Sequence, residues 1–113
     1  MDKQRLLYEN LKNIKDYWVE SSLEGLNPDT DLIWSEFEEQ YKLLQSKIIT
    51  DTEKAAYEKI LNEVIQGVLH SVLVMIDGGD ELADSYTLDL IDRETTESLK
   101  ESIALHEEIL IIY

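Results

Sequence analysis

Apolar residues recur at helical spacing through the first half of the chain. The first stretch carries one amphipathic stripe, with steps of four, three and four, formed by Leu7, Leu11, Ile14 and Trp18. Gly25 and the Asn27-Pro28 pair are expected to end this helix. A second helix is predicted to begin near Asp29–Asp31. Its bulky apolar side is formed by Trp34, Phe37, Tyr41, Leu44 and Ile48. We expect this side to anchor the core, and we assign the aromatic residues of the first two helices to packing.

A third and longer helix is predicted from the capping box at Thr50–Glu53 to about Ile76. Such a helix is roughly 39 Å long at 1.5 Å per residue. Beyond Gly67 its apolar residues spread around almost the whole circumference, which is typical of a buried helix. The sequence therefore predicts that the C-terminal half of this helix, with Val68 and Val72, forms the centre of the domain.

The hydrophobic period changes after this helix. Residues 85–92 alternate apolar and polar positions, which predicts a strand, and 97–101 is expected to return as a second short strand. Ser102 then begins a last helix that carries Ile103, Ile109, Leu110 and Tyr113. The expected fold class is mainly α (α+β): a three-helix core with a long central third helix, a short β-hairpin and a C-terminal helix. The chain, 1–113, is expected to form a single domain.

Composition and the apolar segments indicate the cellular compartment and the oligomeric state of the protein. The chain has no cysteine, and 43% of its residues are hydrophobic, which suits a folded protein of a reducing compartment. Its N-terminus lacks the apolar core of a signal peptide. Its longest apolar-rich stretch, 64–76, is shorter than the ~20 residues that span a bilayer. We therefore expect a soluble cytoplasmic protein. The apolar ending 109–113 and the aromatic second helix also favour a homodimer.

Charge narrows the choice of partner. The chain contains 25 Asp and Glu against 10 Lys and Arg, a net charge of −15. From residue 60 onward the basic side chains are Arg93 and Lys100 alone, against twelve carboxylates. This field repels nucleic acid and anionic lipid and attracts cationic surfaces over about 8 Å at physiological salt. The expected partner is a basic protein, with no nucleic acid and no membrane.

Two groups of residues are candidates for chemistry. His70 lies opposite the main apolar stripe, near Glu63 and Asp77, where it would act as a base or simply bond a carboxylate. Four carboxylates flank the glycines that follow the third helix, namely Asp77, Asp80, Glu81 and Asp84. They do not form an EF-hand loop, and no nucleophile stands at a catalytic spacing. We therefore assign no catalytic residue, metal or cofactor.

Residues 67–80 read Gly-Val-Leu-His-Ser-Val-Leu-Val-Met-Ile-Asp-Gly-Gly-Asp within a small, acidic, cysteine-free chain. In size, charge and style the chain resembles the bacterial immunity proteins that neutralise polymorphic or contact-dependent toxins. The resemblance implies a non-enzymatic inhibitor of a cationic protein such as a nuclease toxin, and it assigns no site residue. From charge we predict that His70 and the four carboxylates Asp77, Asp80, Glu81 and Asp84 bind the partner.

Two other classes of function stay open. The first is a regulatory or scaffold protein whose negative charge serves solubility. The second is a small metal-dependent enzyme in which His70 and the Asp77–Asp84 cluster share one pocket.

Overall fold

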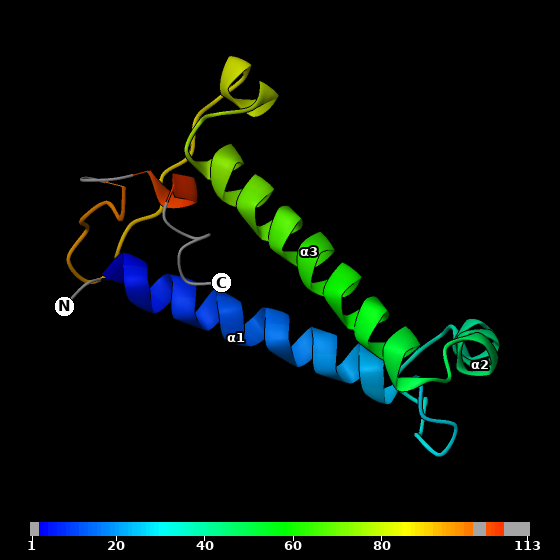
Figure 1. Cartoon of the computed structure of the whole chain (residues 1–113). Helices are drawn as coiled ribbons and strands as arrows, with labels where there is room; N and C mark the ends of the chain where they lie inside the picture. Colours follow the sequence, from blue (N-terminus) through cyan, green and yellow to red (C-terminus); the bar gives the residue numbers. More distant parts are fainter. Residues whose placement is uncertain (1–2, 101–103, 108–113) are drawn as a thin grey trace. The chain divides into compact units, whose positions relative to one another are not determined.

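The computed structural model describes residues 3–100 and 104–107, and in these residues it is mainly helical (Figure 1). The helices are α1 (Lys3–Glu24), α2 (Glu38–Lys47), α3 (Asp51–Ile76) and the short 3-10 helix η1 (Glu81–Asp84). Residues 105–107 form a further helical turn. The contacts divide the chain into two compact units, Met1–Asn13 with Ile65–Tyr113 and, separately, Ile14–Val64.

The ends of α3 confirm its sequence signals. The Thr50 Oγ1 accepts a hydrogen bond from the Glu53 amide at 3.1 Å, and the Glu53 carboxylate accepts one from the Thr50 amide at 2.8 Å. This is the reciprocal capping box. At the other end Gly78 takes a φ of +78°, a left-handed conformation that glycine adopts without strain. The helix therefore begins and ends where the sequence predicts.

The core of the first unit is formed by Tyr8, Leu73 and Leu105, which are at most 3% exposed. Leu69 and Ile76 pack against it, so α3 buries the face that carries these residues and Leu73. The prediction that Val68 and Val72 lie at the centre of the domain is wrong, because they are 57% and 42% exposed. The apolar circumference of α3 beyond Gly67 is thus covered on one side and open on the other.

The second unit buries Val19, Leu26 and Leu32. Gly25, directly after α1, lies against the ring of Tyr41. A Cβ at this position would come within 2.6 Å of the ring carbon Cε1. The Gln45 side chain of α2 donates a hydrogen bond to the Gly25 carbonyl at 2.8 Å. Glycine is needed here because α2 approaches the backbone closely.

Helix α2 begins at Glu38 and not near Asp29–Asp31 as the sequence predicts. Side chains in the preceding segment bond to backbone amides two residues further on. The pairs are Asn27 with Asp29, Asp31 with Ile33, and Ser35 with Phe37, at 2.9–3.0 Å. Such bonds offer the backbone an alternative to the helix, and they hold this segment as a series of turns.

The predicted β-hairpin is wrong, and the fold is mainly α and not α+β. Among the described residues the structure has no strand, and the pairing is limited to one isolated antiparallel bridge between Ile91 and Ser98. The Asp92 carboxylate accepts hydrogen bonds from the amides of Glu94 and Thr95 and so forms a tight turn. The Leu88 carbonyl, which a ladder would use, instead accepts a hydrogen bond from Lys100. Side-chain bonds, one local at Asp92 and one from the more distant Lys100, thus take the place of a ladder beyond this single bridge.

The last predicted helix falls mostly outside the described residues. Ser102, Ile103 and the apolar ending 109–113 lie there, whereas 105–107 are helical. The single-domain prediction for 1–113 stays a prediction beside the two compact units.

The segment Asp51–Asp84, which contains α3, is long and apolar enough by length and composition to cross a membrane. Its uncharged part, Val64–Ile76, has 13 residues. This part extends only about 20 Å as a helix, against a hydrocarbon core of about 30 Å. Spanning a bilayer would therefore place Glu63 or Asp77 near the hydrocarbon, where a charge is costly.

Candidate functional site

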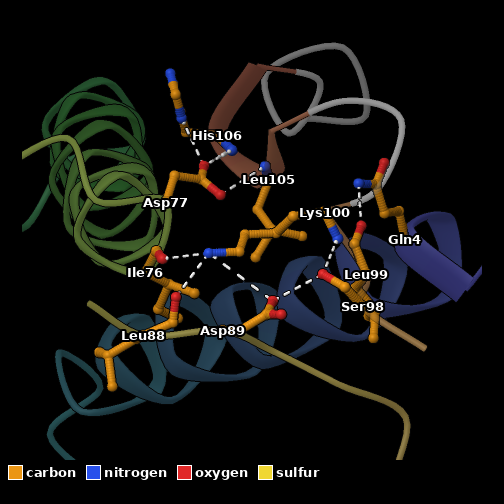
Figure 2. A network of polar contacts seen from close by, with 10 residues as sticks. All are labelled: Gln4, Ile76, Asp77, Leu88, Asp89, Ser98, Leu99, Lys100, Leu105 and His106. Atoms are coloured by element: carbon orange, nitrogen blue, oxygen red, sulfur yellow. Dashed lines mark hydrogen bonds and ion pairs between the residues drawn. The ribbon is translucent and has the colours of Figure 1, made fainter. Parts of the chain in front are cut away.

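Asp77 anchors the turn at 105–107 to the end of α3 (Figure 2). Its carboxylate accepts hydrogen bonds from the Leu105 amide at 3.0 Å and from the His106 amide at 2.9 Å. The His106 ring nitrogen Nδ1 lies 2.6 Å from the same carboxylate. This is the bonding of an N-cap residue supplied from a distant part of the chain.

The Asp77 side chain is only 5% exposed. Burial by itself raises the pKa of this carboxyl, but the hydrogen bonds from His106 and Leu105 outweigh burial and hold its pKa below the ordinary value. The group is therefore ionised and already satisfied within the chain. The structure places this predicted partner-binding residue in a structural role.

His70 contacts the other histidine. The rings of His70 and His106 lie edge to face, with centroids 5.7 Å apart and an interplanar angle of 84°. Because His106 in turn bonds Asp77, the three side chains form one chain of contacts in the first unit. Two of the five predicted residues, His70 and Asp77, are thus brought together through a residue that the sequence analysis did not select.

The remaining carboxylates of the predicted cluster take no part in this chain of contacts. Asp80 caps η1 by accepting a hydrogen bond from the Leu82 amide at 3.0 Å. Glu81 and Asp84 are exposed. The described part of the chain holds no group of three or more His, Asp or Glu side chains placed to bind a metal ion. Of the predicted cluster, Asp80, Glu81 and Asp84 are available to solvent.

Lys100 makes the second attachment at the end of α3 (Figure 2). Its Nζ donates to the carbonyls of Ile76 at 2.8 Å and Leu88 at 2.7 Å, and lies 3.8 Å from the Asp89 carboxylate. A cation at the C-terminal end of a helix is favoured by the helix dipole and by the unpaired carbonyls. This lysine is therefore structural as well.

A second acidic stretch, which the sequence analysis did not select, lies in the second unit. Residues 16–41, named here the acidic–aromatic segment, contain no Lys, Arg or His. Their eight carboxylates are Asp16, Glu20, Glu24, Asp29, Asp31, Glu36, Glu38 and Glu39. Ion pairs in the described residues engage two of these, Asp16 with Lys15 and Glu38 with Lys42. The long run without a basic residue was visible in the sequence.

The same segment exposes aromatic side chains that the sequence analysis assigned to the core. Tyr17, Trp18, Trp34 and Phe37 are 51–62% exposed. Tyr17 and Trp18 lie edge to face at 5.6 Å, and Trp34 meets Tyr41 in the same way at 5.4 Å. Aromatic side chains are enriched in protein interfaces. An acidic surface with exposed aromatic rings has the character of a binding site for a protein.

A hollow of about 370 Å³ lies within this surface. It is lined by Tyr17, Trp18, Ser21, Glu24, Thr30 and Trp34. These residues come from the last turns of α1 and from the turns that follow it. Two of the lining residues are joined directly, because Thr30 Oγ1 donates a hydrogen bond to the Glu24 carbonyl at 2.6 Å.

Comparison of the chain with protein-family models, with curated proteins and with solved structures gives no match.

Proposed function

We propose that this chain is a non-enzymatic acidic module of the cytoplasm that binds a basic protein, in the manner of an immunity-type inhibitor. The observation that carries the proposal is the acidic–aromatic segment. It combines eight carboxylates and no cation with four aromatic side chains that are half or more exposed. The carboxylates attract and orient a cationic partner, and the aromatic rings supply contact area.

The predicted carboxylates Asp80, Glu81 and Asp84 contribute to the same field. Their place in the proposal is long-range attraction, since Glu81 and Asp84 are exposed. Asp77 is left out of the contact surface because its carboxylate is bonded within the chain.

The proposal predicts fast association that salt slows. Electrostatic steering raises association rates well above the ordinary 10⁵–10⁷ M⁻¹s⁻¹, and this gain is lost as ionic strength rises. The candidate partner to test first is the product of the adjacent gene, together with basic proteins captured from lysate.

The experiment measures association by stopped-flow fluorescence between about 0.02 and 0.5 M salt. Reversal of two charges in the acidic–aromatic segment, Glu36→Lys with Glu39→Lys, is expected to slow association more than Asp80→Lys with Asp84→Lys. All four residues are exposed, so the changes at Glu36, Glu39 and Asp84 are each expected to alter folding by no more than about 0.5 kcal/mol. Asp80→Lys also removes the cap of η1 and is expected to cost about 0.5–2 kcal/mol, so circular dichroism checks that this pair is folded. A partner that is neutral or acidic, bound equally well at all salt concentrations, would contradict the proposal and favour the scaffold class.

A further inference from the structure

The hollow in the acidic–aromatic segment has an unusual lining. Three of its six residues are aromatic, one is a carboxylate and two are hydroxyl residues. Trp18 and Trp34 are 52% and 51% exposed, so their rings are open to a ligand. Among the described residues no ion pair engages Glu24, whose backbone carbonyl, and not its carboxylate, is bonded by the turn.

We infer that this hollow binds a cationic side chain, arginine or lysine, of the basic partner. The inference rests on the proposed function and names the contact at its centre. The faces of Trp and Tyr rings attract cations through their quadrupole, Trp most strongly. Glu24 supplies a countercharge to the same cation.

Charge complementarity selects this occupant over others. An anionic group would enter a segment that carries eight carboxylates and no basic residue, so it is repelled. A purely aliphatic side chain would use the rings but leave the Glu24 carboxylate without compensation. A guanidinium stacks on an aromatic plane and donates to a carboxylate at the same time.

The geometry of the hollow is set before the ligand arrives. The amide of Asn27 and the hydroxyl of Thr30 both donate to the Glu24 carbonyl, at 3.0 and 2.6 Å. The Gln45 side chain donates to the next carbonyl, that of Gly25, at 2.8 Å. A preformed site loses less entropy on binding than one that must be ordered. The volume of about 370 Å³ is in the usual range for a ligand site.

The test uses the full chain and two short peptides that differ in one group. The first is acetyl-Gly-Arg-Gly-amide, and the second carries citrulline, a neutral isostere, in place of arginine. Binding is measured by Trp fluorescence and by amide chemical shifts of residues 17–34. The arginine peptide is expected to saturate and to bind about tenfold more tightly than the citrulline peptide, a difference typical of a cation at an aromatic and acidic site.

Matched variants locate the binding. Trp34→Leu and Glu24→Gln are each expected to lower the affinity for the arginine peptide by about five- to tenfold. The controls are Tyr86→Leu, an aromatic residue that is 58% exposed outside the segment, and Glu39→Gln, a carboxylate of the segment that does not line the hollow. These are expected to change affinity by less than about twofold. Far-UV circular dichroism checks that each variant is folded.

Equal binding of the two peptides to the unmodified chain would overturn the inference, whatever the variants do. The same holds if Trp34→Leu behaves like Tyr86→Leu. If a basic partner binds with salt dependence while the two peptides bind equally, the inference that the hollow binds a cation is wrong and the proposed function stands. If the arginine peptide binds as expected and no basic partner exists, the proposed function fails and the cation site stands.

Discussion

The change Asp77→Asn tests whether the end of α3 holds the turn at 105–107. It keeps the size of the side chain but replaces one acceptor oxygen by an NH₂ group. In the unmodified chain the carboxylate accepts hydrogen bonds from the amides of Leu105 and His106 and lies against the Nδ1 of the His106 ring. The two amides bond different oxygens of Asp77, so an asparagine can accept from only one of them, and its NH₂ group would face the other donor.

The expected loss follows from these contacts. A hydrogen bond to a charged group contributes about 1.5–3 kcal/mol, and a buried donor left without a partner costs about 1–3 kcal/mol. For a side chain that is 5% exposed we expect Asp77→Asn to lower the free energy of unfolding by about 2–4 kcal/mol. A chain of 113 residues has a total of roughly 6–17 kcal/mol, so the loss is large.

The assay is urea unfolding followed by circular dichroism, with Asp84→Asn as the matched control. Asp84 is exposed, and its replacement is expected to stay within about 0.5 kcal/mol. The urea midpoint of Asp77→Asn should fall by about 1 M or more relative to that control. Hydrogen exchange should show loss of protection at Leu105 and His106. Equal midpoints for the two variants would refute the anchoring role.

Acid supplies an independent check. The folded pKa of Asp77 is lowered, so its contribution is complete above the ordinary value of 3.8 and is lost as the pH falls through the folded pKa. The difference between the unmodified chain and Asp77→Asn should therefore be full at pH 7 and shrink under acid. A difference that stays constant down to pH 2 would show that the carboxylate charge is not involved.

Three further results are expected. Gly25→Ala should destabilise the chain by about 1–3 kcal/mol and alter Trp fluorescence, because the new Cβ would come within 2.6 Å of the Tyr41 ring. Gly67→Ala should stabilise the chain by about 0.5–1 kcal/mol in the same urea assay, because Gly67 lies in open space on α3. The hydrogen bond from Lys3, together with those from the amides of Thr95 and Glu94, lowers the pKa of Asp92 to about 2, so its carboxyl carbon should titrate near that value by NMR. In Lys3→Met the pKa should rise part of the way towards 3.8, and an unchanged midpoint would contradict the Lys3 contact. If the exposed Val68 and Val72 form a homodimer surface, light scattering should give twice the 13.1 kDa monomer mass, and Val68→Ser with Val72→Ser should restore the monomer.

Local sequence signals predicted the ends of α3 correctly, but they did not predict which of its faces is buried. The capping box and the Gly78 stop fix the ends of α3 through contacts between residues a few positions apart, which a sequence pattern contains. The face that α3 buries depends on distant residues such as Tyr8 and Leu105, so periodicity alone placed Val68 inside although it is 57% exposed. The strand pattern at 85–92 failed for a similar reason. Lys100, beyond the predicted turn, takes the carbonyl of Leu88.

The candidate site was missed because aromatic residues were assigned to the core. Trp18 and Trp34 fit the apolar stripes of their predicted helices, but Trp34 lies before α2 and both rings are about half exposed. The charge run of 16–41 was readable from the sequence. The sequence did not show that these charges lie beside exposed aromatic rings around one hollow. The hollow is formed in part by turns, and the geometry of those turns depends on bonds such as the one from Thr30 to Glu24.

The hydrogen bond from the Tyr8 hydroxyl to the Leu105 carbonyl, 2.7 Å long, joins residues that are 97 positions apart. On a ribosome that adds about 5–20 residues per second, Tyr8 is made roughly 5–20 s before its partner. The second unit, Ile14–Val64, is continuous in sequence and is complete well before then. Until α3 is made, Leu7, Tyr8 and Leu11 have been synthesised but Leu69, Leu73 and Ile76, which pack in the same core, have not, and Leu105 follows later still. The nascent chain therefore presents an uncovered apolar N-terminal segment to chaperones until α3 has been made, and the core is completed only when Leu105 is added.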